Sequence, residues 1–199
     1  MIKILVTGGI GSGKSTACKM FEELGVSVYY SDLEAKKIMD TNPYVAIRMK
    51  KLFGDDIYKD GALDRKTVAD IVFDKKEMLN SLNEIAHSAV SSHFNEWCNL
   101  EKMSDSPYII EEAAIAIDIG IQDRFDYIVV VTADQETRVK RTMARDNCTR
   151  EKVMSRINSQ TSDEEKLKHA DFVIVNNDFP NLECQVKSIH NKILEIIKK

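Results

Sequence analysis

The sequence predicts an α/β protein built on a five-stranded parallel sheet, with a helical insertion and a helical lid. Three observations predict this fold. Short apolar segments alternate with segments of helical spacing, which is typical of a parallel sheet with helices on its faces. A glycine-rich loop follows the first apolar segment without a polar spacer, and the residues between the second and third apolar segments have helical spacing throughout.

The first strand is expected over residues 2–6, and the loop after it fits the phosphate-binding pattern G-x-x-x-x-G-K-[ST] at Gly8, Gly13, Lys14 and Ser15. Glycine permits the tight turn that brings successive backbone N–H groups to phosphate oxygens. Lys14 is expected on the β- and γ-phosphates, and the Ser15 hydroxyl on Mg²⁺. The helix expected after the loop directs its positive end at the same anion. The loop therefore predicts a nucleotide-binding site.

Composition narrows the class of protein. The chain has 199 residues and a formal net charge of −4, so it lacks the basic surplus of a general nucleic-acid binder. No apolar stretch is long enough to span a bilayer, and the N-terminus is a strand rather than a cleavable signal. The scattered cysteines Cys18, Cys98, Cys148 and Cys184 favour reduced thiols in the cytoplasm. We expect a cytoplasmic protein with no membrane or nucleic-acid partner.

The other predicted elements follow in order along the chain. Apolar, β-branched segments predict strands over residues 26–30, 108–112, 125–132 and 170–177. Helical spacing predicts helices over residues 14–24, 31–39, 134–146 and 182–197. Residues 42–94 are mainly helical in pattern, with breaks at Asn42-Pro43, 54–61 and 73–74, and no β-rich segment is expected between residues 30 and 107.

Asp32 has two compatible interpretations. Ser31 and Glu34 could form a capping box around it, in which case Asp32 only suits the helix dipole. Alternatively, Asp32 lies at the carboxyl end of a parallel strand, the edge where ligands bind. There its carboxylate could accept a proton from an attacking hydroxyl.

Two further groups of residues are open to a structural or a functional interpretation. Arg65 and His87 could contact an anion, although a surface ion pair and a satisfied core histidine are the interpretations that the residues alone favour. The helix after the fourth strand carries Arg138, Arg141 and Arg145 on one face, and Arg150, Arg156 and Gln160 follow it. This face could be solvated, or it could be a flap that supplies charge to transferring phosphates and excludes water.

Several motifs, in this order, resemble the dephospho-CoA kinase family over nearly the whole chain. They are Thr7-Gly-Gly-Ile-Gly-Ser-Gly-Lys-Ser-Thr16, Ser31-Asp32, Phe53-Gly54 with Asp60-Gly-Ala-Leu-Asp-Arg65, Ile85-Ala-His87, Arg141 with Arg145, Arg156 with Gln160, and Ala170-Asp-Phe-Val-Ile with Asn176 or Asn177. The resemblance implies a P-loop kinase core and transfer of the ATP γ-phosphate to the ribose 3′-hydroxyl of dephospho-CoA, the last step of coenzyme A synthesis.

The resemblance also implies roles for individual residues. Catalytic roles fall on Asp32 as the base, Lys14 and Arg141. Nucleotide-binding roles fall on Gly11, Ser12, Gly13, Lys14, Ser15, Thr16, Arg145 and, near adenine, Asn177. Asp32, Arg65 and His87 fall on the side of dephospho-CoA, and Ser15 is the expected Mg²⁺ ligand. A second metal ligand is left open among Asp32, Glu111, Glu112 and Asp118.

The implied organisation is one kinase domain, acting as a monomer without an obligate protein partner. The core comprises residues 1–31, 105–137 and 166–199, the substrate-binding insertion about 32–104, and the lid about 138–165. The chain departs from the family at residues 113–118, where Pro-Leu-Leu-Phe-Glu is usual, and at Ser88, where proline is common. Another small-molecule kinase and a nucleotide-dependent switch are the alternative functions.

Overall fold

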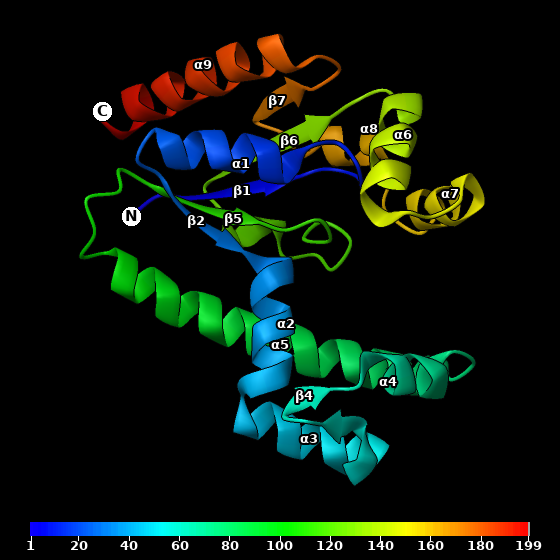
Figure 1. Ribbon diagram of the computed structural model, residues 1–199. Helices are drawn as coiled ribbons and strands as arrows, with labels where there is room; N and C mark the ends of the chain where they lie inside the picture. Colours follow the sequence, from blue (N-terminus) through cyan, green and yellow to red (C-terminus); the bar gives the residue numbers. More distant parts are fainter. Residues whose placement is uncertain (199) are drawn as a thin grey trace. The chain divides into compact units, whose positions relative to one another are not determined.

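The computed structural model describes residues 1–198 and divides the chain into two compact units (Figure 1). The first unit comprises Met1–Tyr30 and the chain from Glu101 onward, and the second comprises Ser31–Leu100. Each unit has its own hydrophobic core.

The first unit contains the five-stranded parallel sheet that the sequence predicts. Its strands, in spatial order, are β2 (Ser27–Tyr30), β5 (Ile109–Glu112), β1 (Lys3–Thr7), β6 (Tyr127–Thr132) and β7 (Phe172–Val175). The register pairs Val6 of β1 with Glu112 of β5 on one side and with Val129 of β6 on the other. Because all strands run in parallel, the loops after β1, β5 and β6 emerge at the same edge of the sheet.

The first unit has five helices among its described residues: α1 (Lys14–Glu23), α6 (Gln135–Asp146), α7 (Arg150–Asn158), α8 (Asp163–Leu167) and α9 (Phe179–Ile197). Two of them, α1 and α9, form the core on one face of the sheet. In Figure 1, α1 and α9 lie side by side over the same face of the sheet. Their apolar sides meet the strands in a core that includes the fully buried Phe21, Ile174 and Ile193. Burying each such side chain stabilises the unit by about 1.5–3 kcal/mol.

The opposite face carries a smaller cluster around Leu5, Ala116 and Ile128. The chain after β5 supplies part of it, and a 3₁₀ turn at Gln122–Arg124 leads into β6. The short helix α8 was not predicted, and α9 begins three residues before its predicted start.

The second unit is mainly helical. Its helices are α2 (Ser31–Thr41), α3 (Pro43–Phe53), α4 (Arg65–Val72) and α5 (Lys76–Glu101), the last ending just beyond the unit boundary. Asn42 caps α3 by accepting a hydrogen bond from Tyr44 N at 2.9 Å, which explains the predicted break there. The core gathers apolar side chains from all four helices and includes Met39, Met49, Val68 and Ile85.

The prediction of no β-structure in this region was wrong. A 3₁₀ turn (Asp55–Ile57) leads into a hairpin of β3 (Tyr58–Lys59) and β4 (Ala62–Leu63). Its turn residues Asp60 and Gly61 both have positive φ, 50° and 81°, as a two-residue hairpin turn of this type requires. The turn signal was visible in the sequence, but strands of two residues are too short to show an alternating pattern.

Two further expectations concern the chain as a whole. The four cysteines are free thiols: Cys18 and Cys98 are buried, Cys148 is half-buried, and Cys184 is exposed. Across the part of the chain that the structure describes, no helix combines the length and apolar character needed to cross a membrane.

Candidate nucleotide-binding site

The loop between β1 and α1 has the backbone geometry of a phosphate cradle. Gly13 precedes the first residue of α1 with φ at 95°, in the left-handed region that favours glycine. A Cβ at this position would lie 2.0 Å from Nδ2 of Asn176, so a side chain would also clash. Asn176 is 4% exposed and donates from Nδ2 to Ser12 O at 2.8 Å. The motif glycine is therefore required by both conformation and packing.

The first turn of α1 is suited to an anion. It begins at Lys14 and contains no acidic residue, so the positive end of the helix dipole is not neutralised there. Lys14 is 8% exposed, with Nζ 3.4 Å from Gly9 O across the loop. Ser15 and Thr16 follow on the exposed side of the same turn.

A cavity of about 340 Å³ opens at this loop. It is lined by Gly11, Gly13, Lys14, Ser15, Thr16, Arg141, Thr142 and Arg145. Its volume falls at the lower end of the range for small-molecule sites. The structure thus brings the predicted phosphate loop together with two of the predicted lid arginines in one hollow of the first unit.

The two arginines of this cavity are held differently. Arg141 donates from Nη1 to Asn176 O at 2.8 Å, and because a guanidinium has five N–H donors it can keep this contact while binding an anion. Arg145 pairs with Asp146, with Nε 2.7 Å from Oδ1, and Arg156 reaches the other oxygen of the same carboxylate at 2.7 Å. Hydrogen bonding from Arg145 holds the pKa of Asp146 below its usual value.

Arg138, unlike Arg141 and Arg145, does not line the cavity as the structure describes it. It is 6% exposed, donates from Nε to Ile10 O at 3.0 Å, and pairs with Asp163. The three arginines lie along α6 as predicted. The first turn of α6 packs on the phosphate loop, so Arg138 is buried, whereas Arg141 and Arg145 line the cavity.

Thr142 is the cavity residue that the sequence did not single out. It is 1% exposed, and its hydroxyl has no hydrogen-bond partner among the described residues. A Cβ at Gly11 would lie 2.6 Å from Thr142 Oγ1, so α6 packs directly against the loop. Only its position, one residue after Arg141, could have pointed to it.

Asn177 does not line this cavity in the part of the chain that the structure describes. Its Oδ1 accepts a hydrogen bond from Asp134 N at 2.9 Å, just before α6 begins. The preceding residue, Asn176, is the one that contacts the loop. Since the sequence offered both, only the structure distinguishes them.

The acidic residues that the sequence offered as metal ligands have different surroundings in the structure. Glu111 and Glu112 are buried in β5. Burial raises the pKa of the Cys18 thiol, and the charge of Glu112 raises it further while that of Lys14 opposes the effect, so Glu112 and Lys14 both lie near Cys18. Asp118 instead accepts from Thr161 N at 2.7 Å and lies 3.8 Å from Nζ of the fully buried Lys166.

The donor set fits Mg²⁺. The Ser15 hydroxyl and the Glu112 carboxylate are hard oxygen ligands of the kind this ion prefers. Residues 1–198 contain no group of three or more His, Cys, Asp or Glu side chains placed to hold a metal. A metal here would therefore take most of its ligands from nucleotide phosphates and water, which is common for Mg²⁺.

The second unit carries the remaining predicted residues. Asp32 is exposed in the first turn of α2. Arg65 pairs with Asp40 at 3.0 Å and donates to Lys36 O at 3.0 Å, so the ion pair that the residues alone favoured is present. His87 is half-buried on α5, and burial lowers the pKa of its imidazole.

Within the second unit, Arg65 also borders a cavity of about 390 Å³. Its walls are mainly apolar side chains of α2, α4 and α5, including Met39, Val68 and Leu82. Lys36 contributes a second cation to the lining. The cavity therefore combines an apolar surface with positive charge.

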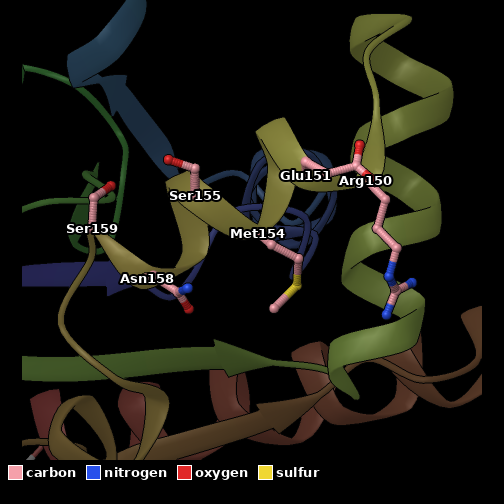
Figure 2. A pocket seen from close by; sticks show the side chains of 6 residues that line it. All are labelled: Arg150, Glu151, Met154, Ser155, Asn158 and Ser159. Atoms are coloured by element: carbon pink, nitrogen blue, oxygen red, sulfur yellow. The ribbon is translucent and has the colours of Figure 1, made fainter.

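A larger hollow of about 700 Å³ runs along α7 (Figure 2). Figure 2 shows its lining, which comes from one helix and the residue after it: Arg150, Glu151, Met154, Ser155, Asn158 and Ser159. Its one cation, Arg150, already forms a two-point pair with Glu136, at 2.9 and 2.5 Å. The hollow lacks the loop amides and the lysine of the smaller cavity, so the phosphate loop is the better candidate site for a nucleotide.

The fold and this site define the class of protein. A parallel sheet with a phosphate loop after its central strand, and an arginine-bearing helix over that loop, is the architecture of a P-loop phosphotransferase.

Comparison with known proteins identifies the family. The dephospho-CoA kinase family model matches residues 2–181. A dephospho-CoA kinase of Bacteroides fragilis is 42% identical over 176 residues, covering 88% of this chain and 85% of the relative. One from Chlamydia felis is 33% identical, covering 89% and 88%. The chain belongs to the dephospho-CoA kinase family, whose members phosphorylate dephospho-CoA with ATP in the last step of coenzyme A synthesis.

Solved structures agree with this assignment. A Thermus thermophilus protein of known crystal structure has a TM-score of 0.82 at 30% identity, covering 96% of this chain and 97% of that one. Dephospho-CoA kinase from Campylobacter jejuni has a TM-score of 0.74 at 27% identity, covering 97% of each chain. Shikimate kinase from Acinetobacter baumannii, at 17% identity and a TM-score of 0.53, shares the fold alone.

Proposed function

We propose that this chain transfers the γ-phosphate of ATP to the ribose 3′-hydroxyl of dephospho-CoA. The observation that carries the proposal is the cavity in which a phosphate loop meets Arg141 and Arg145, in a chain of the dephospho-CoA kinase family. Phosphoryl transfer depends on positioning and charge neutralisation more than on covalent chemistry, and this cavity offers both.

On the nucleotide side, loop amides from Gly11 to Thr16 bind the phosphates, and Lys14 neutralises charge on the β- and γ-phosphates. Arg141 stabilises the charge that develops on the transferring group. Ser15 and, through water, Glu112 would hold Mg²⁺, which would supply further neutralisation of the phosphate charge. Asn176, rather than Asn177, contacts the loop and fixes its shape.

On the acceptor side, Asp32 acts as the base. It follows the last residue of β2 by two positions, and the first turn of α2 limits the motion of its backbone. Its carboxylate takes the proton of the 3′-hydroxyl as that oxygen bonds to the γ-phosphorus. The bond from this phosphorus to the β–γ bridging oxygen breaks, and ADP leaves.

The division of labour along the chain is part of the proposal. Residues of about 32–104 serve as the substrate-binding insertion, with Arg65 and His87 among its contacts, and about 138–165 serve as the lid. The core comprises 1–31, 105–137 and 166–199. The cations of Arg65 and Lys36 beside an apolar cavity suit a substrate that combines phosphates with an uncharged arm. Because ATP and dephospho-CoA are soluble metabolites, we also propose a cytoplasmic enzyme, acting as a monomer.

A coupled ADP-release assay with ATP and Mg²⁺ tests the proposal. We expect ADP release that depends on dephospho-CoA, with the product phosphorylated at the 3′ position, and no release with adenosine or AMP as acceptor. Equal release with and without an acceptor would indicate a hydrolase or switch. Release with the simpler acceptors alone would retain a kinase but remove this substrate. Size-exclusion chromatography with light scattering tests the monomer.

A further inference from the structure

The backbone of Ile10, in the phosphate loop, is hydrogen-bonded at both its N–H and its carbonyl. Its N–H donates to Gln160 Oε1 at 2.9 Å, and its carbonyl accepts from Arg138 Nε at 3.0 Å. Neither Arg138 nor Gln160 lines the nucleotide cavity in the described part of the chain. This part of the loop is therefore fixed by two side chains that lie outside the cavity.

The contact from Arg138 is firmly anchored. Its Nη1 is 2.5 Å from Oδ2 of Asp163, and the same oxygen accepts from the hydroxyl of Thr132 at 3.1 Å. Thr132 is the last residue of β6, so the guanidinium is tied to the sheet through Asp163. A Cβ at Gly9 would lie 2.0 Å from Nη2 of Arg138, which shows how closely the loop packs on it.

Arg138 and Gln160 lie at the two ends of one segment of the chain, residues 138–160. Arg138 lies in α6, and Gln160 follows α7, so the chain between them carries Arg141 and Arg145. Gln160 is half-buried, whereas Arg138 is 6% exposed. The backbone of Ile10 thus forms one hydrogen bond with each end of the segment that supplies the cavity arginines, donating to Gln160 and accepting from Arg138.

We infer that Arg138 and Gln160 are positioning residues for ATP, because they fix the backbone of Ile10 and through it the amides of Gly11 to Gly13. Affinity for the nucleotide then depends on two side chains that do not touch it. The inference rests on the proposed function, in which this loop binds ATP. It adds that the loop and the arginine-bearing segment are ordered together.

A pair of variants at Gln160 tests the inference. Gln160→Met removes the acceptor at similar length, whereas Gln160→Glu keeps an acceptor oxygen for the Ile10 N–H. One hydrogen bond contributes about 1 kcal/mol, so Gln160→Met should weaken ATP binding about fivefold. Gln160→Glu should bind ATP within about twofold of the wild type, which is less than the loss of one such bond. Asn158→Met, an exposed position on the neighbouring α7, is the matched control.

Two measurements on the full chain separate positioning from simple stabilisation. Isothermal titration with ATP gives the affinity without the second substrate, and amide hydrogen exchange of Ile10 reports the contact itself. We expect faster exchange at Ile10 and weaker ATP binding in Gln160→Met, both restored in Gln160→Glu, with the KM for dephospho-CoA unchanged.

Faster exchange at Ile10 with wild-type ATP affinity would overturn the inference, as would equal ATP binding by the two Gln160 variants. A wild-type chain that binds no ATP would overturn the proposed function instead. Arg138→Lys is a second test of the inference. Lysine keeps the positive charge beside Asp163, but it lacks the planar guanidinium that donates to Ile10 O and to Asp163 at the same time. The same change in ATP affinity is expected there.

Discussion

The two units of this chain bury polar groups very differently. Among the described residues, the first unit buries Thr7, Ser12, Lys14, Glu111, Glu112, Arg138, Thr142, Lys166, Asn176 and His190, whereas the second buries Ser31 alone. Buried polar groups cost free energy unless they are hydrogen-bonded, so they persist where the structure holds them in place. The first unit therefore has a pre-organised site, and the second a core of apolar side chains with its polar groups outside.

This difference predicts where single substitutions act. Changes at the phosphate loop should affect chemistry more than the fold, because these residues line the cavity rather than the hydrophobic core. Changes in the apolar core of the second unit should affect stability first. The four predictions below test this contrast, from the largest expected effect to the smallest.

Asp32→Asn should lower kcat about 10²–10⁴-fold, because an amide cannot accept the hydroxyl proton. The KM for ATP should change little, since Asp32 has no place among the residues that line the nucleotide cavity within the described chain. Steady-state kinetics with both substrates measures this. Glu34→Gln, on the same helix, is the control, because Glu34 pairs with Lys37 at 2.6 Å. Normal turnover in Asp32→Asn would show that another group is the base.

Lys14→Met should lower kcat/KM for ATP about 10²–10³-fold, the usual cost of removing one preorganised electrostatic contact to a transition state. The circular dichroism spectrum should be unchanged, because methionine fills a similar volume and keeps helix propensity. Lys19→Met, on the exposed side of the same helix, is the matched control. An equal loss in both variants would point to the helix rather than to the charge at the loop.

Met49→Ala should destabilise the second unit by about 2–5 kcal/mol, since it leaves a cavity where a fully buried side chain stood. Chemical denaturation followed by circular dichroism gives the free energy of unfolding. Ile47→Ala, which truncates a 65% exposed side chain of the same helix, should cost far less. Similar losses in both variants would argue against the core described for this unit.

The smallest effect concerns the ion pair between Arg65 and Asp40. Hydrogen bonding from Arg65 lowers the pKa of Asp40, so the pair adds stability above the pKa of an unfolded aspartate, about 3.9, and loses it as pH falls through the lower folded value. Asp40→Asn should therefore be less stable than the wild type at pH 7. Denaturation midpoints measured from pH 7 to pH 2 should converge at the acidic end. A difference that persists at pH 2 would have another origin, such as the hydrogen bond from Leu63 N to Asp40.

The nucleotide side of this protein was largely predictable from sequence. The spacing of Gly8, Gly13, Lys14 and Ser15 is local, and short-range backbone sterics fix the loop that they form. The five strands were predictable because each contains a short run of apolar, β-branched or aromatic residues. Strand ends shifted by one or two residues, since Asn176 and Asn177 follow β7 rather than belonging to it.

The rest depends on contacts between distant parts of the chain. Arg138 looked equivalent to Arg141 because both share a helix face, and only the packing of α6 on the loop separates their roles. That Asn176, rather than Asn177, contacts the loop depends on which side chain faces Ser12 O, 164 residues away in the sequence. Asp118 resembled a metal ligand, but its partners Thr161 and Lys166 come from a segment that no local pattern connects to it.

The different burial of the four cysteines makes it possible to attach a fluorescent label to one chosen position of this chain. Burial raises the pKa of the Cys18 thiol and so suppresses its reactive thiolate, and Cys98 is buried as well. Cys184 is exposed on α9, and Cys148 is half-buried between α6 and α7. With Cys184 replaced by serine, a thiol-reactive fluorophore would attach at Cys148, within the segment that carries the cavity arginines. A single substitution would therefore allow fluorescence from a label at Cys148 to report on that segment as nucleotide binds.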